Sequence, residues 1–266
     1  MNEVIAQAQA GMLRVTINRP ERRNALSRAV LDGLRHAFEF HVTDDSLQCA
    51  VLTGAGDRSF AAGGDLAEFD ALRGADDARD LFDAAAAALD AVRNFPTPVI
   101  AALNGTALGG GAELAMACDY RVCAAHANFG FVQSTLAITT GFGGGADLFR
   151  MLGSAAAMHA LATGEAWPAQ TAKAMGLIDV IAASGQTLDE AVSEFAKPFF
   201  ERPPHLVRAI KHVANAHRLH AESVRVAERD SFVRTWTNSA HWNAVERMLA
   251  AREAEKAKKA KKAQQE

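Results

Sequence analysis

Residues 98–119 carry the sequence PVIAALNGTALGGGAELAMACD, the most informative stretch of this chain. Its apolar start predicts a buried strand over residues 99–103, and an apolar helix is predicted after the glycines at 109–111. Backbone N–H groups at a helix N-terminus have no partner inside the helix, and the helix dipole favours negative charge beside them. Glu113 falls in the first turn of this helix. The stretch therefore predicts an oxyanion-binding corner with a built-in acid/base.

Apolar strands alternate with helices along the chain as far as about residue 181. This alternation is typical of an α/β core. We expect that core over residues 1–186 and a C-terminal helical region over residues 187–266, ending in a basic, frayed tail at 256–266. Further strands are predicted at 13–17, 49–53, 119–124 and 177–181, and helices after residue 27, at 76–94 and at about 146–163.

The composition is that of a soluble globular protein, with 266 residues of which 49% are hydrophobic and 22% charged. A net charge of −3 argues against a nucleic-acid or membrane partner. The three cysteines include no CxxC pair, which argues against a disulfide framework and against a structural metal site. The N-terminus lacks the basic and apolar segments of a secretory signal, so we expect a cytoplasmic protein.

Four segments in order resemble motifs of the crotonase (enoyl-CoA hydratase/isomerase) superfamily. Residues 98–119 resemble its signature, residues 18–26 (NRPERRNAL) its first coenzyme A loop, and residues 60–66 (FAAGGDL) its second. Residues 129–136 (FGFVQSTL), followed by GFGG at 141–144, resemble its second catalytic segment. The match spans roughly residues 11–181, and four ordered motifs are far more specific than one glycine-rich turn.

This resemblance implies both a fold and a ligand. The fold is an α/β crotonase (ClpP-like) spiral of ββα units, with a C-terminal helical region that makes trimer contacts. The assembly is a homotrimer or a hexamer built as a dimer of trimers. The ligand is an acyl-CoA thioester substrate, and no separate cofactor is expected because coenzyme A is part of that substrate.

The resemblance also assigns the site residues. Gly64 and Gly110 match the positions whose backbone amides hold the thioester oxygen, and Glu113 matches the first catalytic glutamate of family hydratases. Gln133 falls where those hydratases carry the second catalytic glutamate, and a side-chain amide cannot take up a proton at neutral pH. Substrate-binding and coenzyme-binding positions fall on Arg22, Arg23, Ala25, Ala62, Gly63, Asp65, Gly109 and Gly141.

Gln133 leaves more than one reaction open. We expect an enoyl-CoA hydratase-like enzyme that adds water to a 2-enoyl-CoA, with Glu113 exchanging the protons. The alternative is a decarboxylase, or another enolate-forming reaction on an acyl-CoA, because such a reaction needs the oxyanion hole but no second base. A hypothesis from another class is a non-catalytic acyl-CoA binding protein.

Aromatic residues are candidates for the walls of the acyl pocket. Phe131, Phe142 and Phe149 lie near the glycine-rich segments that are predicted to shape it. Trp236 and Trp242, in the helical region, are expected either to cap this pocket or to pack against a neighbouring subunit.

Overall fold

Two β-sheets form the core of the computed structural model, which describes residues 2–218 and 222–263. In the larger sheet β1 pairs with β2 in antiparallel fashion and all other neighbours are parallel. Its spatial order is β1 (Val4–Gln9), β2 (Met12–Ile17), β3 (Cys49–Gly54), β5 (Val99–Leu103), β7 (Tyr120–Cys123) and β10 (Val180–Ile181). The smaller sheet has the order β4 (Ser59–Ala61), β6 (Thr106–Leu108), β8 (Asn128–Gly130) and β9 (Ala166–Pro168).

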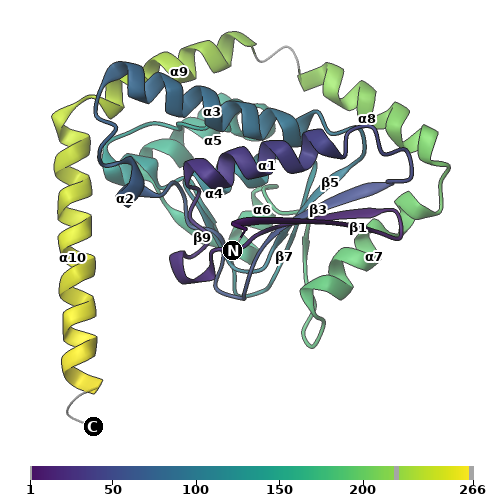
Figure 1. Cartoon of the computed structure of the whole chain (residues 1–266), viewed down its shortest axis with the longest axis horizontal. Helices are drawn as coiled ribbons and strands as arrows, with labels where there is room; N and C mark the ends of the chain where they lie inside the picture. The colour runs from purple at the N-terminus through teal and green to yellow at the C-terminus, as the bar shows by residue number, and fades with distance from the viewer. Residues whose placement is uncertain (1, 219–221, 264–266) are drawn as a thin grey trace.

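The larger sheet is covered on both faces. Every residue of β3 is buried. Ala50 and Leu52 join the core beneath α1 (Arg28–Phe40) and α3 (Ala75–Arg93). Cys49 and Val51 pack instead against α7 (Leu188–Phe200) on the opposite face. The unbroken apolar run of β3 therefore reflects a parallel strand with two buried sides. Figure 1 shows α1 and α3 side by side above the sheet and α7 beyond its other side.

Three inner strands of the larger sheet, β3, β5 and β7, are each followed by a short strand of the smaller sheet and then by helix. The order is β3, β4, α2 and α3, then β5, β6 and α4, then β7, β8 and α5. The predicted α/β core is confirmed in this repeating ββα arrangement. The remaining bounds are α2 (Leu66–Phe69), α4 (Gly110–Ala117), α5 (Gly145–Thr163) and α6 (Ala169–Ala174), with 3-10 turns η1 (Pro20–Arg22) and η2 (Gln133–Leu136).

Several short strands were not predicted from the sequence. Residues 59–61 form β4 and residues 128–130 form β8, although the sequence predicted no strand at either place. β4, β6 and β8 are three residues long, so their sequence has no room for an alternating pattern. β1 was also missed.

The C-terminal helices are α8 (Pro204–Arg218), α9 (Glu222–Trp236) and α10 (Ser239–Ala263). In Figure 1 α9 runs along α3, while α10 is a long helix at one edge of the molecule. The basic segment predicted as a tail continues α10 to Ala263, and its last residues, 264–266, lie outside the described part. The division of the chain near residue 186 stays a prediction. No helix of the described residues is long and apolar enough to cross a membrane.

Candidate active site

The smaller sheet brings three of the predicted motifs together. Its strands β4, β6 and β8 are parallel, and loops at the carboxyl ends of parallel strands share one edge of a sheet. Ala61 lies opposite Ala107 and Leu108 opposite Gly130. The Gly109 N–H donates to the Gly130 carbonyl at 2.9 Å. The loop after β4, the start of α4 and the start of η2 therefore converge.

These loops enclose a cavity of about 80 Å³. Most of the predicted site residues line it: Ala62, Gly63, Gly64, Gly109, Gly110, Glu113, Gln133 and Gly141. The rest of the lining is apolar: Leu66, Phe69, Leu81, Val132, Leu136, Ile138, Phe142, Phe232 and Trp236. The cavity thus combines a few polar groups with an apolar wall, as small-molecule sites usually do.

The backbone amides of Gly64 and Gly110, which both line the cavity, have no acceptor among the described residues. Gly110 is the first residue of α4, where an N–H has no intrahelical partner. Gly64 forms an isolated parallel bridge with Leu26. The two hydrogen bonds of that bridge join Leu26 to the Gly63 carbonyl and to the Asp65 amide, so neither uses the Gly64 amide. A Cβ on Gly110 would lie 2.6 Å from the Phe142 ring. A Cβ on Gly64 would lie 2.9 Å from the Phe69 ring, so a side chain at either position would displace part of the cavity wall.

The carboxylate of Glu113 is buried and accepts four hydrogen bonds. Its Oε1 accepts from Gln133 Nε2 at 2.8 Å and from the Gly141 amide at 3.2 Å. Its Oε2 accepts from the Phe142 and Gly144 amides, both at 2.9 Å. Two oxygens offer about four lone-pair sites, so these donors fix the orientation of the carboxylate, and one of them has to give way before Glu113 can accept a proton from a ligand.

Opposing influences set the proton affinity of Glu113. Burial raises its pKa to about 7, and the negative charge of Glu228 adds to the rise. The amides of Gly144, Phe142 and Gly141 act in the opposite direction because they stabilise the ionised form. A carboxyl group with a pKa near 7 is populated in both forms at neutral pH, which suits a group that must take and return a proton.

Gln133 retains unused hydrogen-bonding capacity. Its side chain is only 7% exposed, and its Oε1 has no hydrogen-bond partner among the described residues. Leaving a buried acceptor unsatisfied costs about 1–3 kcal/mol. Since its Nε2 is already bonded to Glu113, a donor entering the cavity would be bound by Oε1 directly beside that carboxylate.

Glu228 is a second buried carboxylate that sequence reasoning missed. It lies on α9, is 8% exposed, and accepts from the Gly145 amide at 2.9 Å and the Ala146 amide at 3.3 Å. Burial raises its pKa. It does not line the cavity. Eighty-three residues separate Glu228 from Gly145, so no local pattern connects them.

The remaining predicted binding residues lie outside the cavity lining. Arg22 and Arg23 are exposed at η1. Asp65 is bonded to Arg19 at 2.9 Å, and Arg19 also donates to the Ala25 carbonyl at 2.8 Å. Asp65 and Ala25 thus help to hold the loop 18–26 against the loop that follows β4.

The aromatic candidates divide into two groups. Phe142 and Trp236 line the cavity, whereas Phe131 and Phe149 do not. Phe131 instead packs edge-to-face on Phe129 in the core, at 5.9 Å between centroids. Trp236 is held by a hydrogen bond from its Nε1 to the Leu72 carbonyl, so it caps the cavity of its own chain.

Trp242 packs against Trp236, the residue that caps the cavity. It lies edge-on to Trp236 at 5.2 Å, and the guanidinium of Arg73 lies 4.5 Å from its ring centroid. His241 contacts both indole rings and bonds the Leu136 carbonyl through Nδ1. The first residues of α10 therefore connect the aromatic cap to η2, which carries Gln133.

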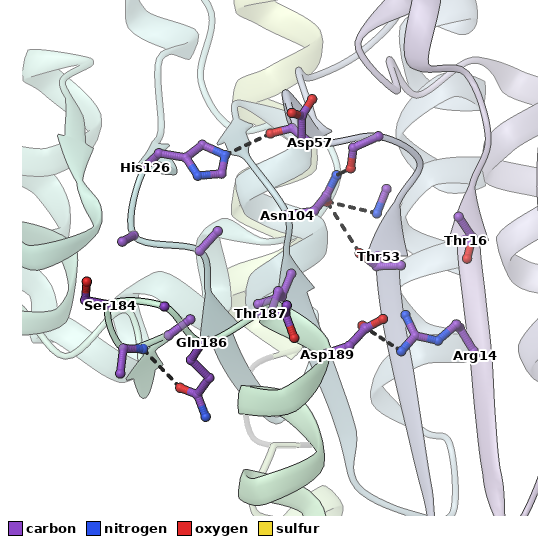
Figure 2. Close-up of a pocket in the computed structure, with 18 residues that line it drawn as sticks. Arg14, Thr16, Thr53, Asp57, Asn104, His126, Ser184, Gln186, Thr187 and Asp189 are labelled. Atoms are coloured by element: carbon purple, nitrogen blue, oxygen red, sulfur yellow. Dashed lines mark hydrogen bonds and ion pairs between the residues drawn. The ribbon is translucent and has the colours of Figure 1, made fainter.

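A second cavity of about 760 Å³ lies at the carboxyl ends of the larger sheet (Figure 2). Several of its polar side chains bond to neighbouring protein groups. Arg14 pairs with Asp189 at 2.8 Å, and the Asn104 side chain bonds the Gly54 amide and the Gly56 carbonyl. This cavity contains none of the predicted catalytic residues.

Comparison with known proteins shows similarity over most of this chain. Residues 7–258 match the family model described as enoyl-CoA hydratase/isomerase. The chain is 38% identical over 211 residues to the 2,3-dehydroadipyl-CoA hydratase of Escherichia coli, covering 79% of this chain and 81% of that protein. It is 35% identical over 212 residues to the crotonyl-CoA hydratase of Syntrophomonas wolfei, covering 80% and 81%.

A solved structure extends this similarity to the fold. The enoyl-CoA hydratase from Bacillus anthracis superposes with a TM-score of 0.76 at 32% identity, covering 85% of this chain and 89% of that one. The crotonase fold predicted from the four motifs is therefore confirmed.

Proposed function

Because the chain belongs to the enoyl-CoA hydratase/isomerase family and is a hydratase-like enzyme of acyl-CoA thioesters, we propose that it hydrates a short-chain 2-enoyl-CoA. One observation carries this proposal: buried Glu113 shares a cavity with the two unpaired amides of Gly64 and Gly110. The relatives named above are hydratases, which gives no support to the decarboxylase or to the non-catalytic binding protein.

In the proposed reaction the thioester oxygen accepts hydrogen bonds from the amides of Gly64 and Gly110. As the water oxygen bonds to C3 of the enoyl group, the double-bond electrons shift toward the thioester oxygen and form an enolate. Preorganised donors are most effective where charge develops in this way, and loss of one typically costs about 2.7–4 kcal/mol.

One carboxylate is sufficient for the proton transfers. Ionised Glu113 takes a proton from the attacking water, and the protonated Glu113 then returns that proton to C2 of the enolate. The product gains hydroxyl at C3 and hydrogen at C2, so atoms and charge balance. Gln133 holds Glu113 through Nε2, and its free Oε1 accepts the second hydrogen of the water.

The cavity favours a short apolar acyl chain. Its volume of about 80 Å³ is well below the roughly 300 Å³ of ordinary ligand pockets. Among the described residues that line it, the only charged side chain is that of Glu113. A carboxylate at the far end of the acyl group would have no cationic partner, so a crotonyl-type substrate fits better than a dehydroadipyl-type one.

Arginines near the cavity supply charge for the phosphates of coenzyme A. Arg22 and Arg23 are exposed on the first loop. Burial lowers the pKa of Arg252 on α10, and the positive charge of nearby Arg23 lowers it further. Guanidinium groups bind phosphate well, and an anion between two of them would relieve their repulsion. Replacing coenzyme A by pantetheine should therefore raise KM, and Arg23→Ala should raise KM only for the coenzyme A thioester.

The assembly we propose is a homotrimer or a dimer of trimers. Leu206, Ile210 and Val213 share one face of α8 and are 42%, 62% and 69% exposed. An apolar stripe of this kind suits a subunit contact. Light scattering should give a trimer or hexamer mass, and Ile210→Glu should reduce it.

The proposed reaction needs no cofactor beyond the coenzyme A of the substrate, and a cytoplasmic location stays an expectation.

The direct test of function is the hydration of crotonyl-CoA, followed by the loss of enoyl absorbance. Glu113→Gln keeps the side-chain size but removes the acid/base, so kcat should fall by about 10²–10⁴-fold. Glu253→Gln on exposed α10 is the matched control and should leave kcat unchanged. Release of carbon dioxide from methylmalonyl-CoA without hydration of crotonyl-CoA would contradict the proposal.

A further inference from the structure

The loop at residues 140–146 is bonded to carboxylates from two different helices. Glu113 on α4 accepts hydrogen bonds from three amides between residues 141 and 144. Glu228 on α9 accepts from the next two, those of Gly145 at 2.9 Å and Ala146 at 3.3 Å. The same short segment therefore orients Glu113 at one end and is held by Glu228 at the other.

Two consecutive glycines allow the backbone to pass between these carboxylates. A Cβ on Gly144 would collide with Glu113. A Cβ on Gly145 would lie 2.8 Å from Glu228 Oε1 and 2.5 Å from Thr140 Oγ1. The Thr140 hydroxyl also hydrogen-bonds Glu228. The two carboxylates thus contact adjacent peptide units, and a shift of one end of the loop would move the other.

Cations near Glu228 are already paired with other carboxylates. Arg93 of α3 bonds Asp147 at 2.8 and 2.9 Å and Asp90 at 2.8 Å, and it donates to the Gly143 carbonyl. Arg225 of α9 bonds Asp90 at 2.7 and 2.9 Å. Other ion pairs on the adjoining helices include Arg229 with Asp83 and Arg150 with Asp147. Arg93 offsets the charge of Glu228 in part.

We propose that Glu228 is a positioning residue for Glu113: it fixes the loop whose amides orient the Glu113 carboxylate, and its charge adjusts how readily Glu113 holds a proton. The proposal rests on the proposed hydration, in which Glu113 takes a proton and returns it. Each carboxylate favours the protonated form of the other, because two buried like charges close together are not both ionised easily. The charge of Glu228 contributes, after burial, to the raised pKa of Glu113.

The first test compares Glu228→Gln with Asp230→Asn, which makes the same charge change at an exposed position of α9. Glu113 works in its ionised form, so kcat falls as pH drops through its pKa. Removing the charge of Glu228 should move this acidic limb about one pH unit lower. It should also lower kcat at pH 8 by about tenfold, with little change in KM, because the loop is less well held. Asp230→Asn should change neither quantity.

The second test needs no substrate. The infrared band of the protonated Glu113 carboxyl, assigned by its loss in Glu113→Gln, should titrate with a lower midpoint in Glu228→Gln. Amide hydrogen exchange at residues 141–146 should be faster in that variant. If the wild-type protein does not hydrate crotonyl-CoA, the proposed function fails, whereas these two readouts still test Glu228.

A third variant, Glu228→Asp, keeps the charge but shortens the reach to the amides. It should leave the infrared midpoint within a few tenths of a unit of wild type, while exchange at residues 141–146 rises and kcat falls. This variant remains informative if Glu228→Gln does not fold. A folded Glu228→Gln with unchanged midpoint and exchange, or a Glu228→Asp with wild-type exchange and kcat, would overturn the proposal.

Discussion

Two cavities in the described part of the molecule differ in size and in the state of their polar groups. The larger, of about 760 Å³, is lined by pairs such as Arg14 with Asp189, which bond to each other. The smaller, of about 80 Å³, contains the unpaired amides of Gly64 and Gly110 and the unpaired Oε1 of Gln133. Both lie at the carboxyl ends of parallel strands, one at each sheet.

Unused hydrogen-bonding capacity therefore marks a reaction site better than volume does. Buried donors and acceptors are normally paired, so unpaired ones in an apolar cavity call for a ligand. In the larger cavity several polar side chains, those of Arg14, Asn104, Gln186 and Asp189, are bonded to protein groups. A substrate entering the smaller cavity would meet donors for its oxygen and an acceptor beside a carboxylate.

The largest effect is expected at Gly110. Gly110→Ala places a Cβ against the Phe142 ring and displaces one of the two oxyanion donors. We expect kcat/KM for crotonyl-CoA to fall by about 10²–10³-fold, the usual consequence of losing such a donor. Gly56→Ala in the larger cavity is the counterpart and should leave kcat/KM near wild type in protein that remains folded. Comparable losses in both variants would break the comparison.

Gln133 gives the next largest effect. Gln133→Leu removes both the bond to Glu113 and the free acceptor, so kcat should fall by about 10–100-fold. Gln133→Glu places a second carboxylate at the Oε1 of Glu113, and the repulsion should raise the pKa of the pair. Activity depends on ionised Glu113, so the acidic limb of the kcat profile should move to higher pH. A limb that moves lower would contradict this electrostatic account.

Trp236 should control chain length with a smaller effect. Trp236→Leu widens the apolar end of the cavity, so the ratio of kcat/KM for 2-hexenoyl-CoA over crotonyl-CoA should rise by about tenfold. Trp167→Leu is the matched control, because Trp167 is also buried but lies on β9 outside the lining. A ratio that is unchanged in Trp236→Leu would show that the indole does not limit the acyl chain.

The smallest effect is expected in the larger cavity. Arg14→Ala removes an ion pair whose side chains are 32% and 70% exposed. Exposed pairs contribute little, so the free energy of unfolding should fall by less than about 1 kcal/mol. Hydration of crotonyl-CoA should stay within twofold of wild type. A tenfold loss of kcat would indicate that this cavity takes part in the reaction.

Sequence patterns located the larger sheet except for β1, but they did not locate the smaller one. β3 and β5 are mostly apolar strands of six and five residues, long enough to be recognised. β4, β6 and β8 have three residues each, and they owe their conformation to pairing with one another. The site was nevertheless predicted, because the motifs that follow these short strands are themselves distinctive.

Contacts between distant segments were beyond the sequence. The lack of a second catalytic glutamate at position 133 was visible, but the bond between Gln133 and Glu113 was not. Glu228 gave no signal, because its partners lie on a loop 83 residues away and α9 has no motif of its own. Burial and neighbouring charge raise the pKa of Glu113 to about 7, and both arise only in the folded chain.

One measurement tests the central claim most directly, because glycines line both cavities. In protein labelled with ¹⁵N-glycine, a saturated thioester, butyryl-CoA, can be added and the amide resonances followed. The account predicts the largest shifts at Gly64 and Gly110 of the smaller cavity and none at Gly54 or Gly185 of the larger one. Shifts at Gly54 and Gly185 with Gly64 and Gly110 unmoved would contradict it.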